Sequence, residues 1–357
     1  MHLKINFMKT FCLLLFLLVA SIGHSQVYLS SRHTHSPLNY KKKSHYKLDV
    51  LLEKFKKTET IFLLSDIYDI KEYEKILRDS WTVTPFQVVK LADFDYQKYL
   101  NSQYSIAQIK TFTVMYGTTP SNVQVIFDLS FHDSEATLEK LEKLAPEKRK
   151  NKLASVINAN TETIAYYWLL RNDDFLGRRD NLTNRIFEDL RYDESEWDPL
   201  RQEIILSCYK DDVFHNYKLG FLKNYLQQMN ELIEAEQHHI PYEDVRLPEL
   251  KKLTQNTLYI PSYLADEISE PEVLGAYNYR YEIISDEELN TKILNNDELY
   301  YLSFNLASSL KWFEVINSKT GTVLYRNFRG SEYLLGEWCK IKHIESLNSA
   351  IKKASKK

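Results

Sequence analysis

The sequence predicts an α/β (α+β) protein with two similar small α/β lobes, each containing a β-hairpin, separated by a helical module. Three observations lead to this fold class. Short apolar runs bounded by polar turns are typical of buried strands, and apolar residues spaced three and four apart are typical of amphipathic helices. The same order of strand and helix signals also occurs twice. We therefore place the lobes at 48–133 and 253–357 and the helical module at 134–252.

The first lobe shows a buried-strand signal at 60–64, because the residues of that run are almost all apolar. Pro85 then breaks the chain, and Asp93 is placed to cap a short helix. The stretch 123–131 alternates apolar and polar residues, as a half-buried strand does. In chain order we predict a helix at 48–57, a strand at 60–64, a helix at 70–81, a strand at 86–91, a short helix at 93–100 and a hairpin of strands 111–116 and 123–131 joined by a loop at 118–122.

The middle of the chain changes to helical spacing, from Ser134 to about His239. The first helix contains Leu138, Leu141 and Leu144, and Pro146 interrupts it. The further helices predicted in this module are 153–170, 182–190, 199–206 and 217–236.

The second lobe repeats the pattern of the first. Thr257-Leu-Tyr-Ile matches Thr60-Ile-Phe-Leu, and the run 279–286 matches 86–93, each ending in an aspartate that can cap a helix. We therefore predict an internal repeat. Its predicted elements are strands at 257–261 and 279–284, a helix at 286–294, strands at 299–304, 312–316 and 322–328, with a turn at 317–321, and a closing helix at 338–353.

The N-terminus has the pattern of a secretory signal peptide at 1–25. Two lysines precede an apolar run at 11–20, and small residues occupy the positions before a cut between Ser25 and Gln26. The apolar run is too short to span a bilayer, and no later stretch reaches the ~18 apolar residues that a spanning helix needs. We expect cleavage, followed by a flexible leader at 26–47 and no transmembrane segment in the mature chain.

The composition fits a globular protein, with 44% hydrophobic and 27% charged residues. The formal charge of −3 becomes −5 when Lys4 and Lys9 are removed with the signal peptide. An acidic balance argues against a general nucleic-acid binder, which needs a basic face to neutralise phosphates. The 8 glycines leave no Gly-rich loop that would cradle a phosphate.

The Ser25–Gln26 ending and the Lys-, Asn-, Ile- and Tyr-rich composition resemble those of exported proteins of Bacteroidota. The lysine-rich closing helix, 351–357, does not resemble the β-rich sorting domain that such bacteria use for secretion across the outer membrane. The resemblance implies retention in the periplasm, with association with the outer membrane left open.

No catalytic, cofactor-binding or metal-ligating residue is assigned, and no cofactor is expected. The weak candidates have ordinary structural interpretations: histidines in a solvated leader, a Glu-x-x-His pair at a helix end, thiols that are buried or paired, and aspartates in loops and caps. They are His33, His35 and His45; Glu236 and His239; Cys208, Cys339 and His343; and Asp173, Asp174, Asp211 and Asp212. Whether Cys208 and Cys339 form a disulfide stays open.

Two further features bear on partners. The basic cluster Lys148–Lys150 with Lys152, and the pair Arg178–Arg179, suit either a solvated face or an acidic partner or lipid headgroups. Aromatic residues are too numerous for all of them to be exposed, and any that remain outside the core would suit partner binding. The prominent groups are Tyr166–Trp168, Tyr300–Tyr301, Trp312–Phe313 and Trp338.

Three function classes follow. The first is a non-catalytic interaction protein of a bacterial cell envelope, a subunit or accessory factor of a periplasmic or outer-membrane assembly, with envelope proteins as partners. The second is a periplasmic ligand-binding protein with its site between the lobes, the ligand being unknown. The third is a hydrolase with an unrecognised site. We favour the first because no catalytic motif is present.

Overall fold

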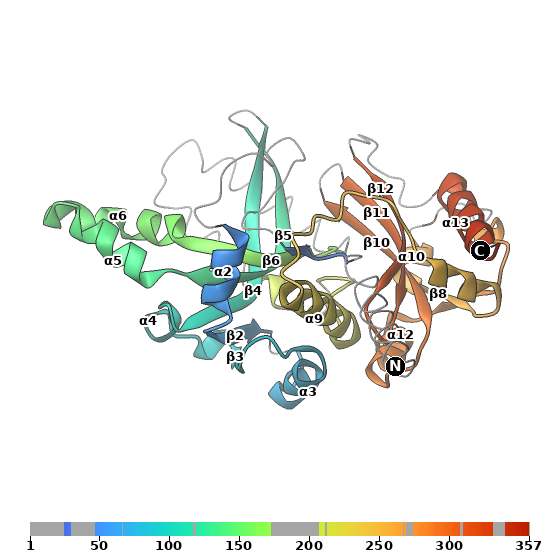
Figure 1. Ribbon diagram of the computed structural model, residues 1–357, viewed down its shortest axis with the longest axis horizontal. Helices are drawn as coiled ribbons and strands as arrows, with labels where there is room; N and C mark the ends of the chain where they lie inside the picture. The colour runs from blue at the N-terminus through green and yellow to red at the C-terminus, as the bar shows by residue number, and fades with distance from the viewer. Residues whose placement is uncertain are drawn as a thin grey trace, which may run out of the picture.

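The computed structural model describes residues 25–29, 47–65, 67–116, 119–172, 207–210, 213–266, 268, 274–307, 310–330 and 340–356. These residues build two lobes side by side, each around a six-stranded sheet (Figure 1). Lobe 1 contains strands β1 to β6, and lobe 2 contains β7 to β12. The α/β class expected from the sequence is therefore confirmed. Within the described ranges, no helix has both the length and the apolar character that crossing a bilayer requires.

The sheet of lobe 1 has the strand order β1-β6-β5-β4-β2-β3. Strand β2 is parallel to β3 and β4, and the other neighbouring pairs are antiparallel. The strands are β1 (Tyr28–Leu29), β2 (Glu59–Leu64), β3 (Phe86–Lys90), β4 (Tyr104–Tyr116), β5 (Thr119–His132) and β6 (Thr161–Trp168).

The sheet of lobe 2 has the order β7-β12-β11-β10-β8-β9, which is the order of lobe 1 with six added to every strand number. Strand β8 is parallel to β9 and β10, and the other pairs are antiparallel, as in lobe 1. The internal repeat is therefore confirmed at the level of strand order and direction. The strands are β7 (Val245–Arg246), β8 (Leu258–Pro261), β9 (Tyr281–Ile284), β10 (Tyr300–Ala307), β11 (Leu310–Asn317) and β12 (Val323–Arg329).

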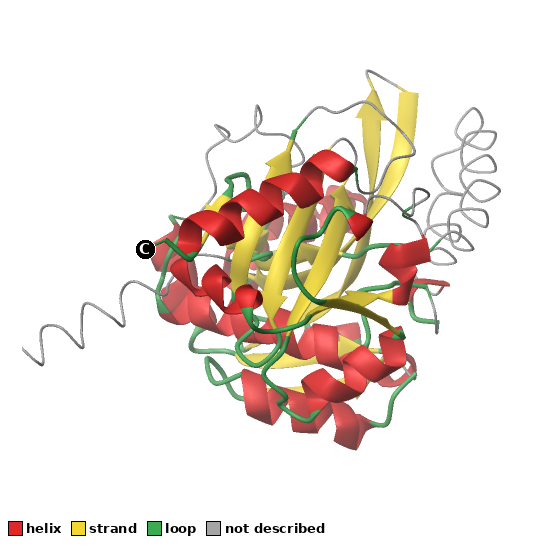
Figure 2. Cartoon of the chain, turned by 90° about the vertical axis from the view of Figure 1, so that its right-hand side faces the viewer, coloured by secondary structure: helices red, strands yellow, loops and turns green. Residues whose placement is uncertain are grey.

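The repeat extends to the helices. One helix joins the first two strands of each lobe, and a long helix follows each last strand; α13 lies across the sheet of lobe 2 in Figure 2. The helices are α2 (Leu48–Phe55), α3 (Ile70–Ser80), η2 (Leu91–Asp93), α4 (Tyr96–Tyr99), α5 (Ser134–Glu142), α6 (Pro146–Ala159), α9 (Leu219–Glu234), η4 (Pro248–Thr254), α10 (Ser262–Asp266), α12 (Asp286–Leu294) and α13 (Ile341–Ala354).

The alternation predicted for the second strand of the first hairpin is observed in β5. Val125, Phe127 and Leu129 lie in the largest hydrophobic core, against helices of lobe 1 and α9. Ile126, on the opposite face, packs in a smaller cluster with residues of lobe 2. Both faces of this sheet are thus apolar over part of their area, which allows lobe 2 to pack on one of them.

Helix α9 is buried on nearly all sides, with twelve of its 16 residues inside the protein. Toward lobe 1, Tyr225 stacks on Tyr167 with ring centroids 3.8 Å apart. Toward lobe 2, Asn224 accepts a hydrogen bond from the hydroxyl of Tyr301. A helix buried all round belongs to a core rather than to a surface. α9 is therefore the shared centre of the two lobes (Figure 1).

Two glycines allow lobe 2 to approach α9 closely. A Cβ on Gly220 would lie 3.0 Å from both the carbonyl oxygen of Asn290 and the Cβ of Ile293 on α12. Gly321, in the turn between β11 and β12, has φ +72°, and a Cβ there would lie 2.7 Å from the carbonyl oxygen of Asn224. The turn predicted at 317–321 thus needs its glycine for backbone conformation and for space.

The described part of the helical module differs from its prediction in two places. Residues 161–168 form the buried strand β6 of lobe 1, whereas a helix was predicted over 153–170. Strand β7 and the 3-10 helix η4 belong to lobe 2. The sequence predicts that this lobe starts at residue 253, but β7 begins at Val245 and η4 at Pro248. The predicted helices at 182–190 and 199–206 lie outside the described residues.

The expected flexible leader, 26–47, is also wrong at its start. Val27, Tyr28 and Leu29 have no exposed surface, and Tyr28–Leu29 form β1 against β6. The physical reason is that β6 leaves an edge inside the protein, and buried backbone groups on that edge require partners.

We predict that Gly321→Ala lowers the free energy of unfolding by at least about 2 kcal/mol, because alanine is strained at this φ and its methyl group meets the backbone of α9. The midpoint of thermal unfolding measures the effect. Gly275→Ala is the matched control, since no atom lies within 4 Å of its added Cβ, and it should leave the midpoint unchanged or slightly higher. Equal midpoints for the two variants would contradict the proposed contact.

Candidate functional site

Within the described residues, the two lobes differ clearly in the connection between their last two strands. In lobe 2, β11 and β12 are joined by the tight turn that contains Gly321. In lobe 1, β5 and β6 are joined by a hairpin of two helices, α5 and α6, which we call the arm. The arm extends away from the body of lobe 1 (Figure 1). Because the strand order is repeated, the arm is a part of lobe 1 that the shared fold does not explain.

The base of the arm is held by polar contacts. Asn160 is fully buried and donates to the hydroxyl of Thr137 (3.2 Å) and to the carbonyl of Val156 (2.9 Å). Asp133 caps α5 by accepting from the backbone N–H of Ala136 (2.9 Å), as an N-cap residue does. The arm therefore leaves the sheet at a fixed point rather than as a loose loop.

The arm buries very little of its own surface. Thr137 is the buried residue of α5, and every residue of α6 from Pro146 to Leu153 is exposed. Leu138 and Leu153 are 59% and 44% exposed, among the highest values for large apolar side chains in the described residues. Most helices in proteins gain their stability by packing an apolar face. The arm presents apolar side chains, Leu138 and Leu153, that the described part of the chain leaves exposed.

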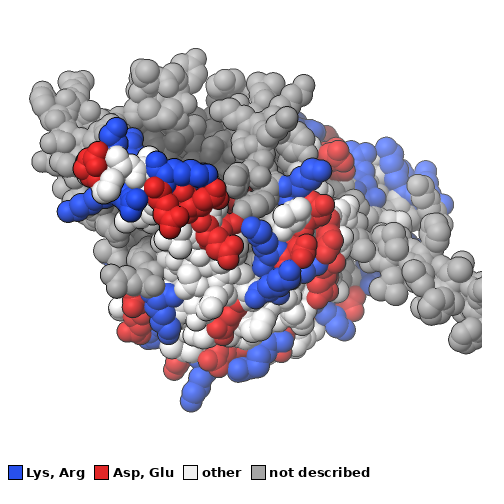
Figure 3. Space-filling view, turned by 60° about the vertical axis from the view of Figure 1, so that its left-hand side comes forward, with Lys and Arg blue, Asp and Glu red and all other residues white. Residues whose placement is uncertain are grey.

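The arm has six basic and four acidic residues, a net charge of +2 in a chain of net charge −3. Arg149 donates to the carbonyl oxygens of Leu144 and Glu142 and thereby closes the hairpin. The side-chain amines of the exposed Lys148, Lys150 and Lys152 make no hydrogen bond or ion pair within the part of the chain that the structure describes. On the face drawn in Figure 3, basic and acidic side chains are otherwise interleaved.

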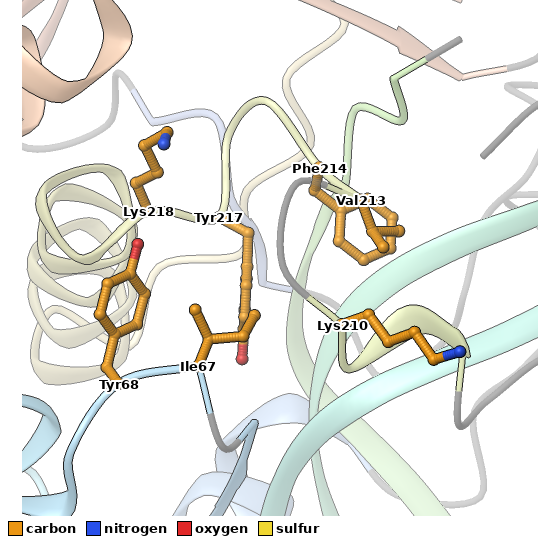
Figure 4. Close-up of a pocket in the computed structure, with 7 residues that line it drawn as sticks. All are labelled: Ile67, Tyr68, Lys210, Val213, Phe214, Tyr217 and Lys218. Atoms are coloured by element: carbon orange, nitrogen blue, oxygen red, sulfur yellow. The ribbon is translucent and has the colours of Figure 1, made fainter. Parts of the chain in front are cut away.

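A pocket lies beyond the carboxyl end of β2, where ligands often bind in α/β sheets. We call it the β2 pocket. It contains about 270 Å³ of space, part of it open to solvent. Its lining comes from the loop after β2 and from the segment before α9 (Figure 4). The lining residues are Ile67, Tyr68, Lys210, Val213, Phe214, Tyr217 and Lys218.

The polar group of most interest in the β2 pocket is the hydroxyl of Tyr217. Tyr217 is 4% exposed, and its buried hydroxyl has no hydrogen-bond partner in the described structure. Burial raises the pKa of this phenol well above its ordinary value, and nearby tyrosine hydroxyls add to the shift. The lysines do not converge on it: Lys218 pairs with Glu287, and the amine of Lys210 points away from Tyr217 in Figure 4.

The contact between the lobes is filled by side chains. Tyr28 stacks on Tyr166 and meets Trp312 of β11 edge-on. Behind these rings, Glu314 and Arg326, each 1% exposed, form an ion pair at 2.5 Å. The described residues therefore place packed rings and a closed polar network where the sequence suggested a ligand site between the lobes.

The structure separates the residues of the predicted Glu-x-x-His pair. Helix α9 ends at Glu234, and Glu236 lies beyond it with φ 52°, so the two residues do not share a helix face. Glu236 pairs with Lys56, and His239 bonds to the carbonyl of Ser25 (2.9 Å). Within the described ranges, no three His, Cys, Asp or Glu side chains come together as metal ligands.

The remaining candidates are buried or lie outside the described residues. Cys208 is a free, buried thiol, and burial raises its pKa to about 12, which makes it a poor nucleophile. His343 stacks on Phe313. The aromatic groups at 166–168, 300–301 and 312–313 are buried, so they form core and not a docking patch. Outside the described residues lie His33, His35, His45, Asp173, Asp174, Arg178, Arg179, Asp211, Asp212, Trp338 and Cys339.

Sequence reasoning named the lysines of the arm but not its projection from the body, since exposure depends on what the rest of the chain covers. It missed the β2 pocket, because Tyr68 and Tyr217 are far apart in the sequence. No protein-family model matches the chain, and comparisons with curated proteins and with solved structures find no significant match. The arm and the β2 pocket thus rest on the geometry of this protein alone.

We predict that Tyr217→Phe leaves the thermal midpoint unchanged or raises it, because an unpaired buried hydroxyl costs about 1–3 kcal/mol. Tyr209→Phe is the control: its hydroxyl accepts from the backbone N–H of Ile109 (3.1 Å), so this variant should lose about 1 kcal/mol. A lower midpoint for Tyr217→Phe would mean that a bound water or ligand partners the hydroxyl.

We also predict that the protein loses stability as pH falls below about 6.5, the ordinary histidine value. Burial lowers the pKa of His132, which contacts Thr161 at the base of the arm (3.1 Å), so the unfolded chain takes up the proton first. Thermal midpoints at pH 7.5 and 5.5 should differ less in His132→Gln than in the unmodified protein. An equal difference in both would remove His132 as the cause.

Proposed function

We propose that the protein is an exported, non-catalytic interaction protein of a bacterial cell envelope, a subunit or accessory factor of a periplasmic or outer-membrane assembly, and that the arm binds the acidic surface of a partner protein. One observation carries the proposal: α6 is exposed along its entire first half, including Leu153, although it is anchored at a fixed base. An ordered helix that packs so little against its own chain suits a surface built for another protein.

Charge supports the choice of an acidic partner. Lys148, Lys150 and Lys152 occupy the end of the arm and have no carboxylate partner in the described structure. A group of cations steers association with acidic surfaces, and apolar side chains beside it supply contact area. Leu138 and Leu153 provide such area within the same hairpin.

Affinity purification of the tagged mature protein from a gently solubilised native envelope tests the proposal. We predict that one or more envelope proteins are recovered at near-equal amounts. Charge reversal in the triple variant Lys148→Glu, Lys150→Glu and Lys152→Glu should reduce that recovery by at least about tenfold, because three attractive contacts become repulsive. Recovery by the unmodified protein should also fall with added salt, which screens exposed charges.

The matched control reverses three exposed lysines away from the arm: Lys71→Glu, Lys75→Glu and Lys251→Glu. It changes the total charge equally and should retain the partner. A second variant, Leu138→Ser with Leu153→Ser, should lose the partner while stability changes by less than about 0.5 kcal/mol, because both side chains are exposed. Purification of the protein alone, or equal recovery by the arm and control variants, would contradict the proposal.

A second candidate function, binding of a small ligand, is favoured by the unpaired hydroxyl of Tyr217 in the β2 pocket. The pocket is small for a ligand site, and its walls are largely aromatic and aliphatic, so the ligand would be a compact molecule with one polar group facing Tyr217. Native mass spectrometry of the gently purified protein would reveal a retained mass that Tyr217→Phe lacks. The hydrolase alternative has less support, because the described lining residues include neither a carboxylate nor a histidine.

A further inference from the structure

The segment Ser25–Leu29, which we call the N-terminal segment, lies inside the contact between the lobes. Ser25 and Gln26 are 4% and 6% exposed, and the next three residues have no exposed surface. Leu29 exchanges two backbone hydrogen bonds with His239, at 3.0 and 3.1 Å. In Figure 1 the segment is the dark-blue strand between the two sheets. The residues at the expected cleavage point are therefore part of the folded structure.

The side chain of Gln26 reaches into lobe 2. Its amide nitrogen donates to the hydroxyl of Ser303 (3.2 Å) and to Glu314 (2.5 Å). Glu314 also accepts from Arg326 (2.5 Å), and both members of this pair are 1% exposed. A buried ion pair is tolerated only when its remaining hydrogen-bonding groups are satisfied.

Ser25 supplies the group that satisfies Arg326. The Ser25 carbonyl accepts from the guanidinium of Arg326 (2.5 Å) and bonds to His239 (2.9 Å). The Ser25 hydroxyl donates to Gln228 of α9 (2.8 Å) and accepts from the N–H of Val27 (2.9 Å). One residue thus connects strand β12, helix α9 and the start of β1.

A cut between Ser25 and Gln26 would damage this network twice. It would remove the carbonyl that Arg326 uses, which leaves buried donors unpaired. It would also convert the N–H of Gln26, 2.5 Å from the side-chain oxygen of Gln228, into an ammonium group. That group would be a second buried cation next to Arg326, with the Glu314 carboxylate shared between them.

We infer that the signal peptide is removed between Gly23 and His24, so that Ser25 stays in the mature protein as part of the contact between the lobes. A signal peptidase requires small residues one and three positions before the cut, and Gly23 with Ser21 meets this requirement as well as Ser25 with Gly23 does. The step is hydrolysis by water: the peptide bond breaks to give a carboxylate on Gly23 and an amine on His24. The inference rests on the predicted signal peptide and is independent of the partner of the arm.

The first test is to express the full chain with its own signal peptide in an exporting bacterial host and to identify the mature N-terminus by mass spectrometry of its terminal peptide. We expect the chain to begin at His24. A chain that begins at Gln26, at any other residue, or that is not cut at all would overturn the inference.

Two single variants separate the two possible cuts. Ser21→Tyr places a bulky residue three positions before the inferred cut and leaves the two residues that a cut after Ser25 requires. Ser25→Leu blocks the cut after Ser25 only. We expect Ser21→Tyr to abolish the chain that begins at His24, whether the precursor accumulates or is cut later, and we expect Ser25→Leu to be processed normally at His24. Accumulation with Ser25→Leu and normal processing of Ser21→Tyr would overturn the inference.

A stability measurement tests the physical reason. Chains that begin at His24 or at Gln26 can be released from fusions by a site-specific protease. We expect a thermal midpoint several degrees lower for the Gln26 chain, with the gap narrowing as pH rises from 7 to 9. An ammonium buried beside the guanidinium of Arg326 costs free energy that a neutral amine does not, so loss of the proton at higher pH should restore part of the stability. The titratable and charged groups that contact Ser25 or Gln26 are Tyr225, His239, Glu314 and Arg326. Equal midpoints at every pH would show that Ser25 is dispensable and would overturn the argument.

Discussion

The structure depends on the burial of α9 between two sheets. A helix that is covered on nearly all sides needs a partner for each of its polar groups, and α9 has several. Asn224 donates to the carbonyl of Ser318, Gln228 donates to that of Gly321, and Lys223 donates to that of Ile293. Each of these acceptors belongs to lobe 2, whereas much of the apolar surface of α9 packs against lobe 1. The apolar surface of α9 therefore packs against both lobes, and these hydrogen bonds fix lobe 2 relative to the helix.

The two lobes share their strand order but have diverged in their connections. Strands β4 and β5 have 13 and 14 residues, whereas β10 and β11 have 8 each. The arm is a further addition to lobe 1. Both additions lie at hairpin connections, where insertions are tolerated because the core pairing is unaffected. Lobe 2 has neither addition, and both α9 and the N-terminal segment make contacts with it.

The sequence was sufficient for elements whose pattern reflects one buried face. Helix α12 and strands β10 to β12 lie close to their predicted positions, because their alternation or helical spacing is regular. The hairpin of β4 and β5 was predicted too short, since β4 begins at Tyr104 and β5 at Thr119, inside the predicted loop. Strand β6 was missed because residues 164–170 are all apolar, as is usual for a strand covered on both faces, and such a run follows a helix without a visible break. Strand β1 has two residues and exists only because β6 offers an edge.

The candidate sites were predictable only in part, because they depend on contacts between residues that are far apart in the sequence. Lys148, Lys150 and Lys152 are visible in the sequence, but the exposure of their amines without a partner among the described residues is a property of the fold. The β2 pocket is lined by a loop near residue 67 and by a segment near residue 217, and no local sequence pattern predicts that these two segments lie next to each other. The buried pair of Glu314 and Arg326 is also undetectable from spacing, since its members lie on neighbouring strands twelve residues apart.

The hydrogen bond between Ser25 and Arg326 joins residues 301 positions apart. In a chain that crosses a membrane from its N-terminus, the segment that completes the contact between the lobes emerges first, and its binding site in β12 emerges nearly last. In an exported chain, the N-terminal segment would therefore lack its partners in lobe 2 until the end of the chain is delivered. Contacts of such long range form slowly, and unpaired edges invite aggregation. The fold thus gives an advantage to any factor that shields the emerging chain during this interval.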